Sequence, residues 1–288
     1  MALQSQTKTF LKGIISAFTI FRGKANYTNL SRYCHFSERI IRRWFNKGLS
    51  YMYLNSTLLR YIPSDHEKIG AIDSSFMKKS GKNTDGLTMF WSGCDSKSKK
   101  GLEMSLITIV DMNANTAYGL DAKQTIVQED KTRADLYADH IESNFDSLRK
   151  HGVTHIAADA YYTKNVFINR LTNNGFEIVG KFRRDADLKW LYKDVQSGVG
   201  RPKKYDGKVQ FDSNDKFEYD GNVDGVDIYS AKVYAVKMKK KINLVLLRNI
   251  ADGSYALLFS TNLQLNAHTI IKYYKARFQI EFFIRDSK

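Results

Sequence analysis

The clearest pattern of apolar and polar positions lies near the C-terminal end of the chain, in residues 274–288. Apolar residues recur there at steps of three and four, and neither proline nor glycine interrupts them, which predicts a helix. At about 100° per residue, four positions fall on one stripe roughly 60° wide. These are Tyr274, Arg277, Glu281 and Lys288. Apolar side chains flank this stripe on both sides.

A charged stripe between two apolar walls predicts a helix face that lines a cleft, because burying unpaired charge is costly. The alternative is an exposed ion pair between Arg277 and Glu281 at i,i+4 spacing. Such a pair stabilises a helix by only roughly 0.2–0.5 kcal/mol. The pattern alone leaves both interpretations open.

Residues 63–182 show short apolar runs separated by turn residues and by two helical patterns. Strands are expected at residues 68–76, 87–93, 102–110, 153–159 and 176–182, and helices at 131–150 and 163–171. We expect the first three strands to form an antiparallel meander, and the later strand–helix–strand order to form a parallel unit. This order is that of the ribonuclease H-like α/β fold, a mixed sheet flanked by helices. In that fold the first and fourth strands are neighbours and a late helix packs across them.

Residues 186–258 break this rhythm. Asp-Gly pairs begin at positions 206, 220, 224 and 252, beside runs of alternating apolar and polar residues. Such pairs are typical of β-hairpin turns. We therefore predict a β-rich insertion within a domain that spans residues 63–288.

Residues 1–62 are predicted to form a small helical region with a helix-turn-helix inside. Residues 28–34 would form its first helix, and Ser37 would cap a second helix at residues 38–45. Three arginines project from that helix away from its apolar face, where a recognition helix contacts DNA. These are Arg39, Arg42 and Arg43. The alternative is a basic helical hairpin that reads no groove.

The charge balance narrows the class of partner. Lys and Arg number 45 against 30 Asp and Glu, a net charge of +15 with a pI near 9.6. This excess favours nucleic acid over the weaker options of a ribosomal protein or a membrane-surface protein. Basic clusters at residues 181–184, 201–204 and 237–241 fit a track for DNA.

Cysteine usage and the N-terminal apolar run indicate the compartment. Cys34 and Cys94 form neither a disulfide framework nor a metal-binding spacing, which suits a reducing cytosol. The run from Phe10 to Phe21 is too short to span a bilayer. We expect a soluble, cytoplasmic protein without a membrane partner.

Three acidic residues stand where the expected fold would bring them together. Asp73 lies in the first strand, Asp159 ends the fourth, and Glu281 lies on the late helix. Clustered carboxylates repel one another unless a cation is present, and hard oxygen ligands suit Mg²⁺ or Mn²⁺. Two such ions about 3.5–4 Å apart activate a water or a 3′-hydroxyl for attack at phosphorus. Either aspartate taken alone is more often a turn, a cap or an ion-pair residue.

The four-residue stripe is similar to a known signature, Tyr-x2-Arg-x3-Glu-x6-Lys, of a large group of bacterial insertion-sequence transposases. The segments around Asp73 and Asp159 also resemble the blocks around that group's first and second catalytic aspartates, so that the resemblance covers roughly residues 68–288. It implies a DDE transposase in which three acids hold the metal and catalyse: Asp73, Asp159 and Glu281. It further implies three residues that hold phosphates beside the scissile bond: Tyr274, Arg277 and Lys288.

The resemblance implies metal-dependent cleavage at the ends of a mobile element and joining of the 3′-hydroxyl to target DNA, with two Mg²⁺ or Mn²⁺ ions per site. The implied partners are the terminal inverted repeats, the target DNA and a second copy of the chain, in the cytoplasm at the nucleoid. In related transposases the β insertion helps to hold a hairpin at the transposon end, and an aromatic residue stacks near a flipped base. The aromatic candidates here are Trp190, Tyr255 and Phe259.

Similar transposases run on well beyond the last residue of the signature, whereas this sequence ends on it at Lys288. We therefore expect a C-terminally truncated copy. One alternative is a catalytically inactive copy that only binds DNA. Another is a nuclease or resolvase of the same fold, which would lack the tyrosine, arginine and lysine that accompany the acids.

Overall fold

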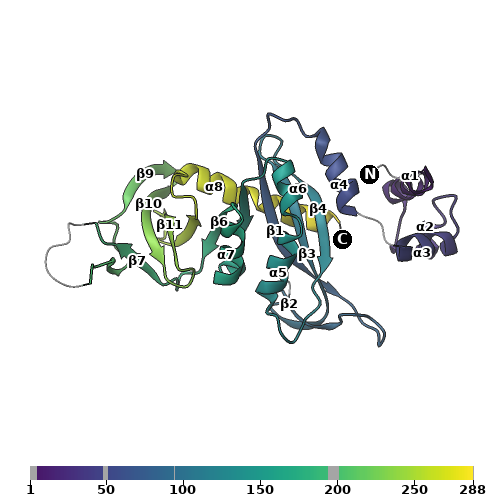
Figure 1. The fold of residues 1–288 in the computed structure, drawn as a ribbon, viewed down its shortest axis with the longest axis horizontal. Coiled ribbons are helices and arrows are strands. Elements are labelled where there is room, and N and C mark those ends of the chain that lie inside the picture. The colour runs from purple at the N-terminus through teal and green to yellow at the C-terminus, as the bar shows by residue number, and fades with distance from the viewer. Residues whose placement is uncertain (1–4, 48–50, 94, 194–200, 288) are drawn as a thin grey trace. The chain divides into compact units, whose positions relative to one another are not determined.

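The computed structural model describes residues 5–47, 51–93, 95–193 and 201–287 (Figure 1). Two compact units follow one another along the chain, Met1–Leu54 and Asn55–Lys288. The division falls within helix α4 (Tyr51–Leu58), earlier than the predicted boundary at residue 62. None of the helices in the described ranges combines the length and the apolar character that a bilayer crossing requires.

The first unit packs three helices around aromatic side chains. These are α1 (Ser5–Ile20), α2 (Tyr27–Leu30) and α3 (Glu38–Lys47). Ile41 of α3 is fully buried, and the Trp44 ring stacks on Phe10 with centroids 5.0 Å apart. The helix predicted at 38–45 is thus present, whereas the helix predicted at 28–34 is one turn that ends at Leu30. After this turn the chain places the Phe36 ring against Gly13 of α1, where a Cβ would lie 2.6 Å from the ring.

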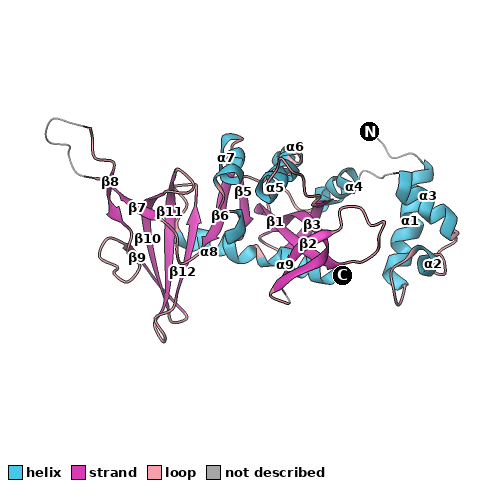
Figure 2. Cartoon of the chain, turned by 90° about the horizontal axis from the view of Figure 1, so that it is seen from below, coloured by secondary structure: helices cyan, strands magenta, loops and turns pink. Residues whose placement is uncertain are grey.

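The second unit contains one mixed sheet with helices on both faces (Figure 2). Its strands are β1 (Lys68–Lys78), β2 (Thr88–Ser92), β3 (Lys97–Asp111), β4 (Thr116–Gln124), β5 (His155–Ala158), β6 (Glu177–Phe182), β7 (Leu188–Leu191), β8 (Tyr205–Lys208), β9 (Glu218–Val223), β10 (Val226–Ala235), β11 (Lys240–Asn249) and β12 (Tyr255–Ser260). Its further helices are η1 (Leu59–Tyr61), α5 (Arg133–Glu142), α6 (Phe145–Lys150), η2 (Ala160–Tyr162), α7 (Asn165–Asn173), α8 (Ala267–Ala276) and α9 (Phe278–Asp286), of which η1 and η2 are 3₁₀ helices.

The strand order confirms the predicted fold class, a large mixed α/β sheet flanked by helices. The order is β2-β3-β1-β5-β6-β12-β11-β10-β7-β8, with β4 paired to β3 and β9 to β10. Strand β1 runs antiparallel to β3 and parallel to β5, and β5 runs parallel to β6. The first strand therefore lies between an antiparallel partner and the predicted fourth strand, as the ribonuclease H-like order requires.

The predicted meander is wrong in its order. Strand β3 lies between β1 and β2, and it pairs as well with β4, a strand that the apolar pattern missed. Strand β4 buries only Leu120 among its side chains. An edge strand with one buried residue shows no alternation of apolar and polar positions, so it gives no periodic signal.

Residues 186–258 form hairpins that continue the same sheet, because β12 pairs with β6. Asp224 and Gly225 form the turn between β9 and β10, both with positive φ, and Asp252-Gly253 lies between β11 and β12. The other two Asp-Gly pairs are not turns. Positions 206–207 lie in β8, and positions 220–221 lie in β9 beside an irregularity in its pairing with β10.

The two faces of the sheet carry different helices (Figure 2). Ile72 of β1 packs in the apolar cluster that includes side chains of α5, α6 and α7. Ile69 and Ala71 pack in the other cluster, with α8 and α9. Successive side chains of a strand point to opposite faces, so Asp73 shares the face of Ala71. The strand's alternation thus directs Asp73 toward α8 and α9.

The helix predicted at 131–150 is divided into α5 and α6 at Ser143 and Asn144. The Ser143 hydroxyl donates to the carbonyl of His140 at 2.6 Å, and the Asn144 amide donates to Asp121 Oδ2 at 3.0 Å. Short polar side chains of this kind compete with the hydrogen bonds of a helix, so the helix ends and restarts there.

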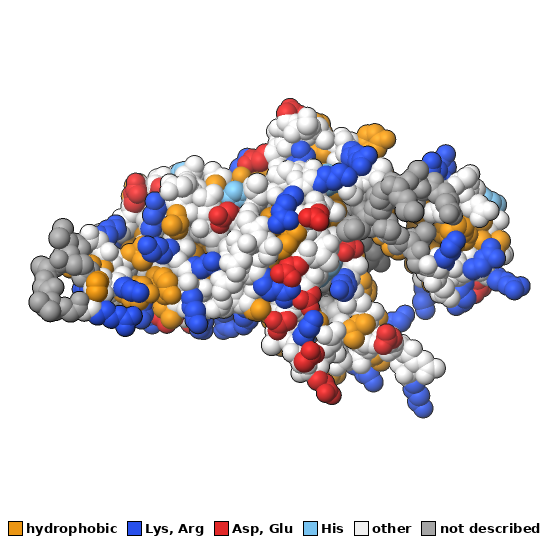
Figure 3. Space-filling model, viewed as in Figure 1, with side chains coloured by type: hydrophobic (Ala, Val, Ile, Leu, Met, Phe, Trp, Pro, Cys, Tyr) orange, Lys and Arg blue, Asp and Glu red, His pale blue; other side chains and the backbone are white. Residues whose placement is uncertain are grey.

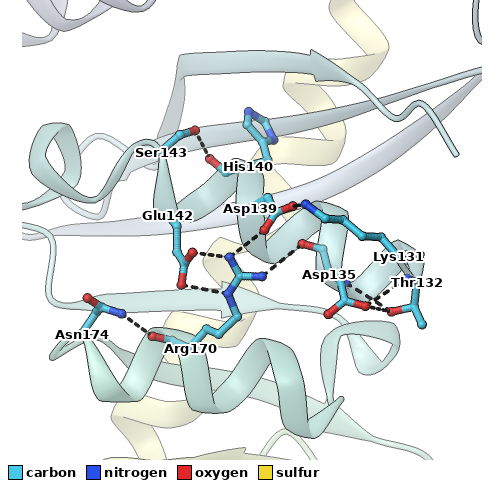
Figure 4. A network of polar contacts seen from close by, with 9 residues as sticks. All are labelled: Lys131, Thr132, Asp135, Asp139, His140, Glu142, Ser143, Arg170 and Asn174. Atoms are coloured by element: carbon cyan, nitrogen blue, oxygen red, sulfur yellow. Dashed lines mark hydrogen bonds and ion pairs between the residues drawn. The ribbon is translucent and has the colours of Figure 1, made fainter. Parts of the chain in front are cut away.

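An ion network fastens α7 to α5 (Figure 4). Arg170 of α7 points between two carboxylates of α5; its Nη2 lies 2.7 Å from Asp139 Oδ1, and its Nε donates to Glu142 Oε1 at 2.8 Å. Lys131 Nζ also donates to Asp139, at 2.7 Å. Helix α5 begins with a capping box between Thr132 and Asp135. These contacts hold both helices over the face of the sheet opposite Asp73.

We expect Arg170→Met to lower the free energy of unfolding by about 1–2 kcal/mol at pH 7, because it leaves two partly buried carboxylates without their fork-shaped donor. Burial alone would raise the pKa of Asp139, but hydrogen bonds from Lys131 and Arg170 outweigh burial and lower it; the Arg170 hydrogen bond lowers the pKa of Glu142. The stabilisation is therefore present above the ordinary values of 3.8 and 4.5 and is lost as pH falls through the lowered values. Urea unfolding at pH 7 and pH 3 measures this difference. An equal loss at both pH values would contradict the ionic origin, and Arg183→Met, whose side chain is 80% exposed, is the control.

Candidate active site

Two predicted acids lie side by side because their strands are neighbours. The parallel pairing of β1 with β5 aligns Ala71 with Ala157. Asp73 and Asp159 each follow two residues later in the same strand direction. Asp159 Oδ1 accepts a hydrogen bond from the Tyr161 N–H at 2.8 Å, which holds that carboxylate at the start of η2. Both acids therefore lie near the end of β5, on two segments far apart in sequence.

The single helix predicted at 274–288 is two helices, α8 and α9, that meet at Arg277. Tight i→i−3 hydrogen bonds surround this residue: the Arg277 N–H donates to the Tyr274 carbonyl at 3.2 Å, and the Ile280 N–H donates to the Arg277 carbonyl at 3.0 Å. Helix α9 approaches β4 closely, because Gly119 leaves room for the Phe283 ring. A Cβ at position 119 would lie 2.7 Å from that ring.

Arg277 links the acids. It is 5% exposed; its Nη1 lies 3.7 Å from Asp73 Oδ2, and its Nη2 donates to Glu281 Oε1 at 2.6 Å. Its guanidinium lies 4.8 Å from the Phe278 ring centroid and 5.5 Å from that of Tyr274. The stripe thus faces the sheet through Arg277, as the cleft interpretation predicts, although the Glu281 side chain is 45% exposed. The i,i+4 ion pair of the alternative interpretation is present as well.

The surroundings of Asp73 disfavour its charged form. The pKa of Asp73 is raised to about 6; burial is the largest cause, the charges of Asp159 and Glu281 add to the rise, and the Ser74 N–H and Arg277 oppose it. The pKa of Arg277 is raised, since the attraction of Tyr274, Glu281 and Asp73 outweighs burial, which would lower it. A carboxyl group that is repelled by two other acids and partly neutralised by one cation is typical of a functional site.

A cavity of about 490 Å³ opens beside the cluster. Its lining includes Asp159, Tyr274 and Arg277, the basic segment 181–184 and Tyr255. The Arg184 guanidinium lies 5.3 Å from the Tyr255 ring centroid. Further Lys and Arg side chains stand along the edge of the strand-rich part at the left of the molecule (Figure 3). The cavity therefore joins Asp159 to several cations and to the aromatic rings of Tyr255 and Tyr274.

The remaining predicted residues lie elsewhere. Lys288 is outside the described residues. Arg39, Arg42 and Arg43 are exposed on α3 of the first unit. Arg42 pairs with Glu38 at 2.6 Å, which partly neutralises it.

The three predicted metal ligands do not form a preformed metal-binding cluster among the described residues. Within the ranges that the structure describes, no group of three or more His, Cys, Asp or Glu side chains is close enough to hold one ion. Arg277 provides the positive charge between Asp73 and Glu281. The three acids as metal ligands, and Mg²⁺ or Mn²⁺ as their ions, stay a prediction.

The sequence did not predict a group of buried polar side chains near Asp73, which consists of Glu103, Tyr137 and Tyr162. Tyr137 donates to Glu103 Oε1 at 2.5 Å, and Glu103 is 5% exposed. The Tyr162 hydroxyl is buried and has no hydrogen-bond partner among the described residues. Burial raises the pKa of Tyr162 well above its ordinary value, and the charges of Asp73 and Asp159 add to the rise. The sequence signal that could have indicated this buried polar group is Glu103, an acidic residue inside a nearly continuous apolar strand.

Residues 65–288 match the archaeal ISC1217 transposase family. No curated protein sequence matches the chain. The resemblance above pointed to bacterial elements, so a bacterial origin and the four-residue signature stay predictions.

Three solved structures show low similarity. The piggyBac transposase synaptic complex with hairpin DNA has 11% identity and a TM-score of 0.37, over 75% of this chain and 39% of that one. The chain thus spans well under half the length of the piggyBac chain. Ciona intestinalis endonuclease V with an inosine-containing DNA has 13% identity and a TM-score of 0.34, over 82% and 88%. The NurA nuclease from Sulfolobus solfataricus has 11% identity and a TM-score of 0.33, over 83% and 86%.

Proposed function

Because the chain belongs to the archaeal ISC1217 transposase family, we propose that it is the DNA transposase of an insertion sequence. It would cut DNA at the ends of the element and join the freed 3′-hydroxyl to target DNA, as a DDE enzyme. The observation that carries this proposal is that Asp73 of β1 and Glu281 of α9 both pair with Arg277, while Asp159 at the end of β5 lies near enough to help raise the pKa of Asp73. Asp73, Asp159 and Glu281 would be the catalytic residues.

The donor chemistry of this cluster fits a divalent ion. Carboxylate oxygens are the ligands that Mg²⁺ and Mn²⁺ prefer, and mutual repulsion of the acids favours a bound cation. Asp73, Asp159 and Glu281 would hold one or two such ions. When bound, the ions would supply positive charge at the scissile phosphate and lower the pKa of the attacking hydroxyl.

Arg277 would hold a phosphate of the substrate. Its Nε is buried and has no hydrogen-bond partner among the described residues, so one donor of the fork is left for an oxygen atom. Tyr274 and Phe278 flank the guanidinium and limit its rotation. Lys288 would add a point charge, by resemblance alone. Arg277 lines the cavity beside Asp159, so a phosphate there would lie next to its guanidinium.

Tyr255 is the aromatic residue that best fits a role in holding a displaced base. Phe259 is fully buried and stacks on Phe182, with centroids 4.4 Å apart. Trp190 packs edge-on against Phe217 at 5.1 Å. Tyr255, by contrast, lines the cavity beside Asp159, and Arg184 lies against its ring. Stacking on such a ring accepts any base.

DNA is the partner that this function requires. Segment 181–184 would follow the backbone next to the cut, and Arg39, Arg42 and Arg43 of α3 would contact the terminal inverted repeats. Two copies of the chain would hold the two ends of the element. The roles proposed for segment 181–184 and for the α3 arginines rest on the positive charge and the exposure of their Lys and Arg side chains.

The test is a cleavage assay on duplex DNA that carries the inverted repeats flanking the gene. With Mg²⁺ or Mn²⁺ we expect nicks at the repeat ends that leave 3′-hydroxyl groups, followed by joining to a second duplex, and no cutting in EDTA. Binding without any cutting would support the DNA-binding alternative instead. Cutting that ignores the repeats would support a nuclease.

A further inference from the structure

A second basic pocket lies apart from the acid cluster. It has a volume of about 560 Å³, and its lining includes η1, the start of β1, the end of α6 and Tyr273 of α8. The residues that matter for its chemistry are Arg60, Ser64, Lys68, Lys150 and His151. All of them belong to the second compact unit.

Three cations line this pocket without a carboxylate partner in the described part of the chain: Arg60, Lys68 and Lys150. Lys68 Nζ donates to the carbonyls of Pro63 and His66, at 2.9 and 3.0 Å. These hydrogen bonds fix the position of the charge and leave it un-neutralised. The carboxylate in the lining, Glu67, is engaged by Lys272 and by the Tyr273 hydroxyl, each at 2.5 Å.

The pKa of His151 shows that the electrostatic field inside the pocket is positive. Its Nε2 lies 3.0 Å from the Ser56 hydroxyl. Burial lowers its pKa, and the charges of Lys150, Arg60 and Lys68 lower it further. All three cations therefore act on one point from separate elements. Walls of low dielectric strengthen such a field toward an anion.

The pocket is distinct from the catalytic cavity, and the two share no lining residue. Thr154, in the pocket, precedes β5, and Asp159 follows it. At about 3.3 Å per residue the two ends of this strand are roughly 16 Å apart. Phosphates on one DNA strand follow one another about every 3.4 Å along the helix axis, so roughly five steps of a duplex cover the same length. An anion in this pocket is therefore not the phosphate at which cutting occurs.

We propose that this pocket binds one backbone phosphate of duplex DNA, away from the cut. Arg60 and Lys150 contribute exposed charges, Lys68 contributes a charge held by two carbonyls, and the Ser64 hydroxyl is a further donor. The net charge of +15 favours a polyanion over a small one. This assignment rests on the proposed function only for the identity of the polyanion as DNA.

The test measures DNA binding without cutting, so that its outcome is independent of catalysis. Wild-type protein and the double variant Arg60→Gln/Lys150→Gln are titrated into a fluorescent 30-base-pair duplex in EDTA, from about 50 to 200 mM salt. We expect binding about tenfold weaker in the variant, and a slope of log K against log salt that is smaller by about 1, as for one lost phosphate contact. The control Lys97→Gln/Lys100→Gln removes the same charge from exposed positions of β3 that line neither cavity, and its slope should equal that of wild type.

An unchanged affinity and slope in the pocket variant would overturn the proposal. Calorimetric titration with inorganic phosphate separates the two sources of the anion. Heat with phosphate that disappears in the variant, together with unchanged DNA binding, would identify a site for a free anion and would also overturn it. Melting temperatures of all variants are compared first; should the double variant melt lower, Lys150→Gln alone, at an exposed position, gives the same comparison.

Discussion

Asp73→Asn is expected to reduce cutting at element ends by about 10³-fold or more, while DNA affinity stays within about twofold. The substitution keeps size and shape but removes the charge that faces Asp159, Glu281 and Arg277. A neutral amide is also a weaker ligand for Mg²⁺. Initial rates of cutting and equilibrium binding to the same duplex, measured side by side, check both halves of the expectation.

Asp159→Asn and Glu281→Gln should behave in the same way, because the proposed site needs all three acids. The matched control is Asp146→Asn on α6, whose side chain is fully exposed; it should cut at the wild-type rate. Cutting at the wild-type rate by any of the three acid variants would remove that residue from the site. Loss of binding together with cutting would point to a structural role instead.

Asp73→Asn should also make the metal-free protein more stable at neutral pH. The pKa of Asp73 is raised from 3.8 to about 6, so its ionised form is disfavoured in the folded chain. A group whose folded pKa is raised contributes stability below its unfolded pKa and loses it as pH rises through the folded value. Above about pH 6 the wild type therefore carries a cost of at most about 3 kcal/mol, at 1.36 kcal/mol per pKa unit. Asp73→Asn removes this cost, since its amide oxygen can still accept the hydrogen bond from Ser74.

Urea unfolding in EDTA at pH 7.5 and at pH 3.5 measures this effect. We expect Asp73→Asn to be more stable than the wild type at pH 7.5 and to come close to it at pH 3.5, where Asp73 is mostly protonated in both states. Arg277→Met should change stability in the opposite direction, by about 2–3 kcal/mol, because it leaves two carboxylates without their cation. If Asp73→Asn is less stable than wild type at pH 7.5, the inferred cost of ionised Asp73 is contradicted. Added Mg²⁺ should stabilise the wild type and not Asp73→Asn.

These two expectations have one physical origin. Groups that must attract a cation or a phosphate are held together before that partner arrives, and the folded chain is less stable for it. Arg277 reduces the repulsion by pairing with Asp73 and Glu281. Among the described residues, the buried Nε of Arg277 and the Tyr162 hydroxyl have no hydrogen-bond partner, so these polar groups stay unsatisfied.

Much of the fold was predictable because burial imposes a period on the sequence. Strands β1, β3, β5 and β6 and helix α7 lie where apolar runs place them, since each buries a large part of its side chains. Strand β4, with one buried side chain, lacks that period. The break at Arg277 was also out of reach, because residues 274–288 contain no proline or glycine to signal it.

The sequence by itself determined the fold class and the residue types of the stripe, because buried strands and helices leave local apolar patterns. It also led to the nearness of Asp73 to Asp159, because the expected fold makes their two strands neighbours. Only the tertiary structure decided that Arg277 points inward to Asp73 and that Tyr255 shares a cavity with Asp159. It alone also placed Arg60, Lys68 and Lys150 around one pocket at the other end of β5. These groups come from segments far apart in the chain, and their meeting depends on packing between elements, which no local pattern records.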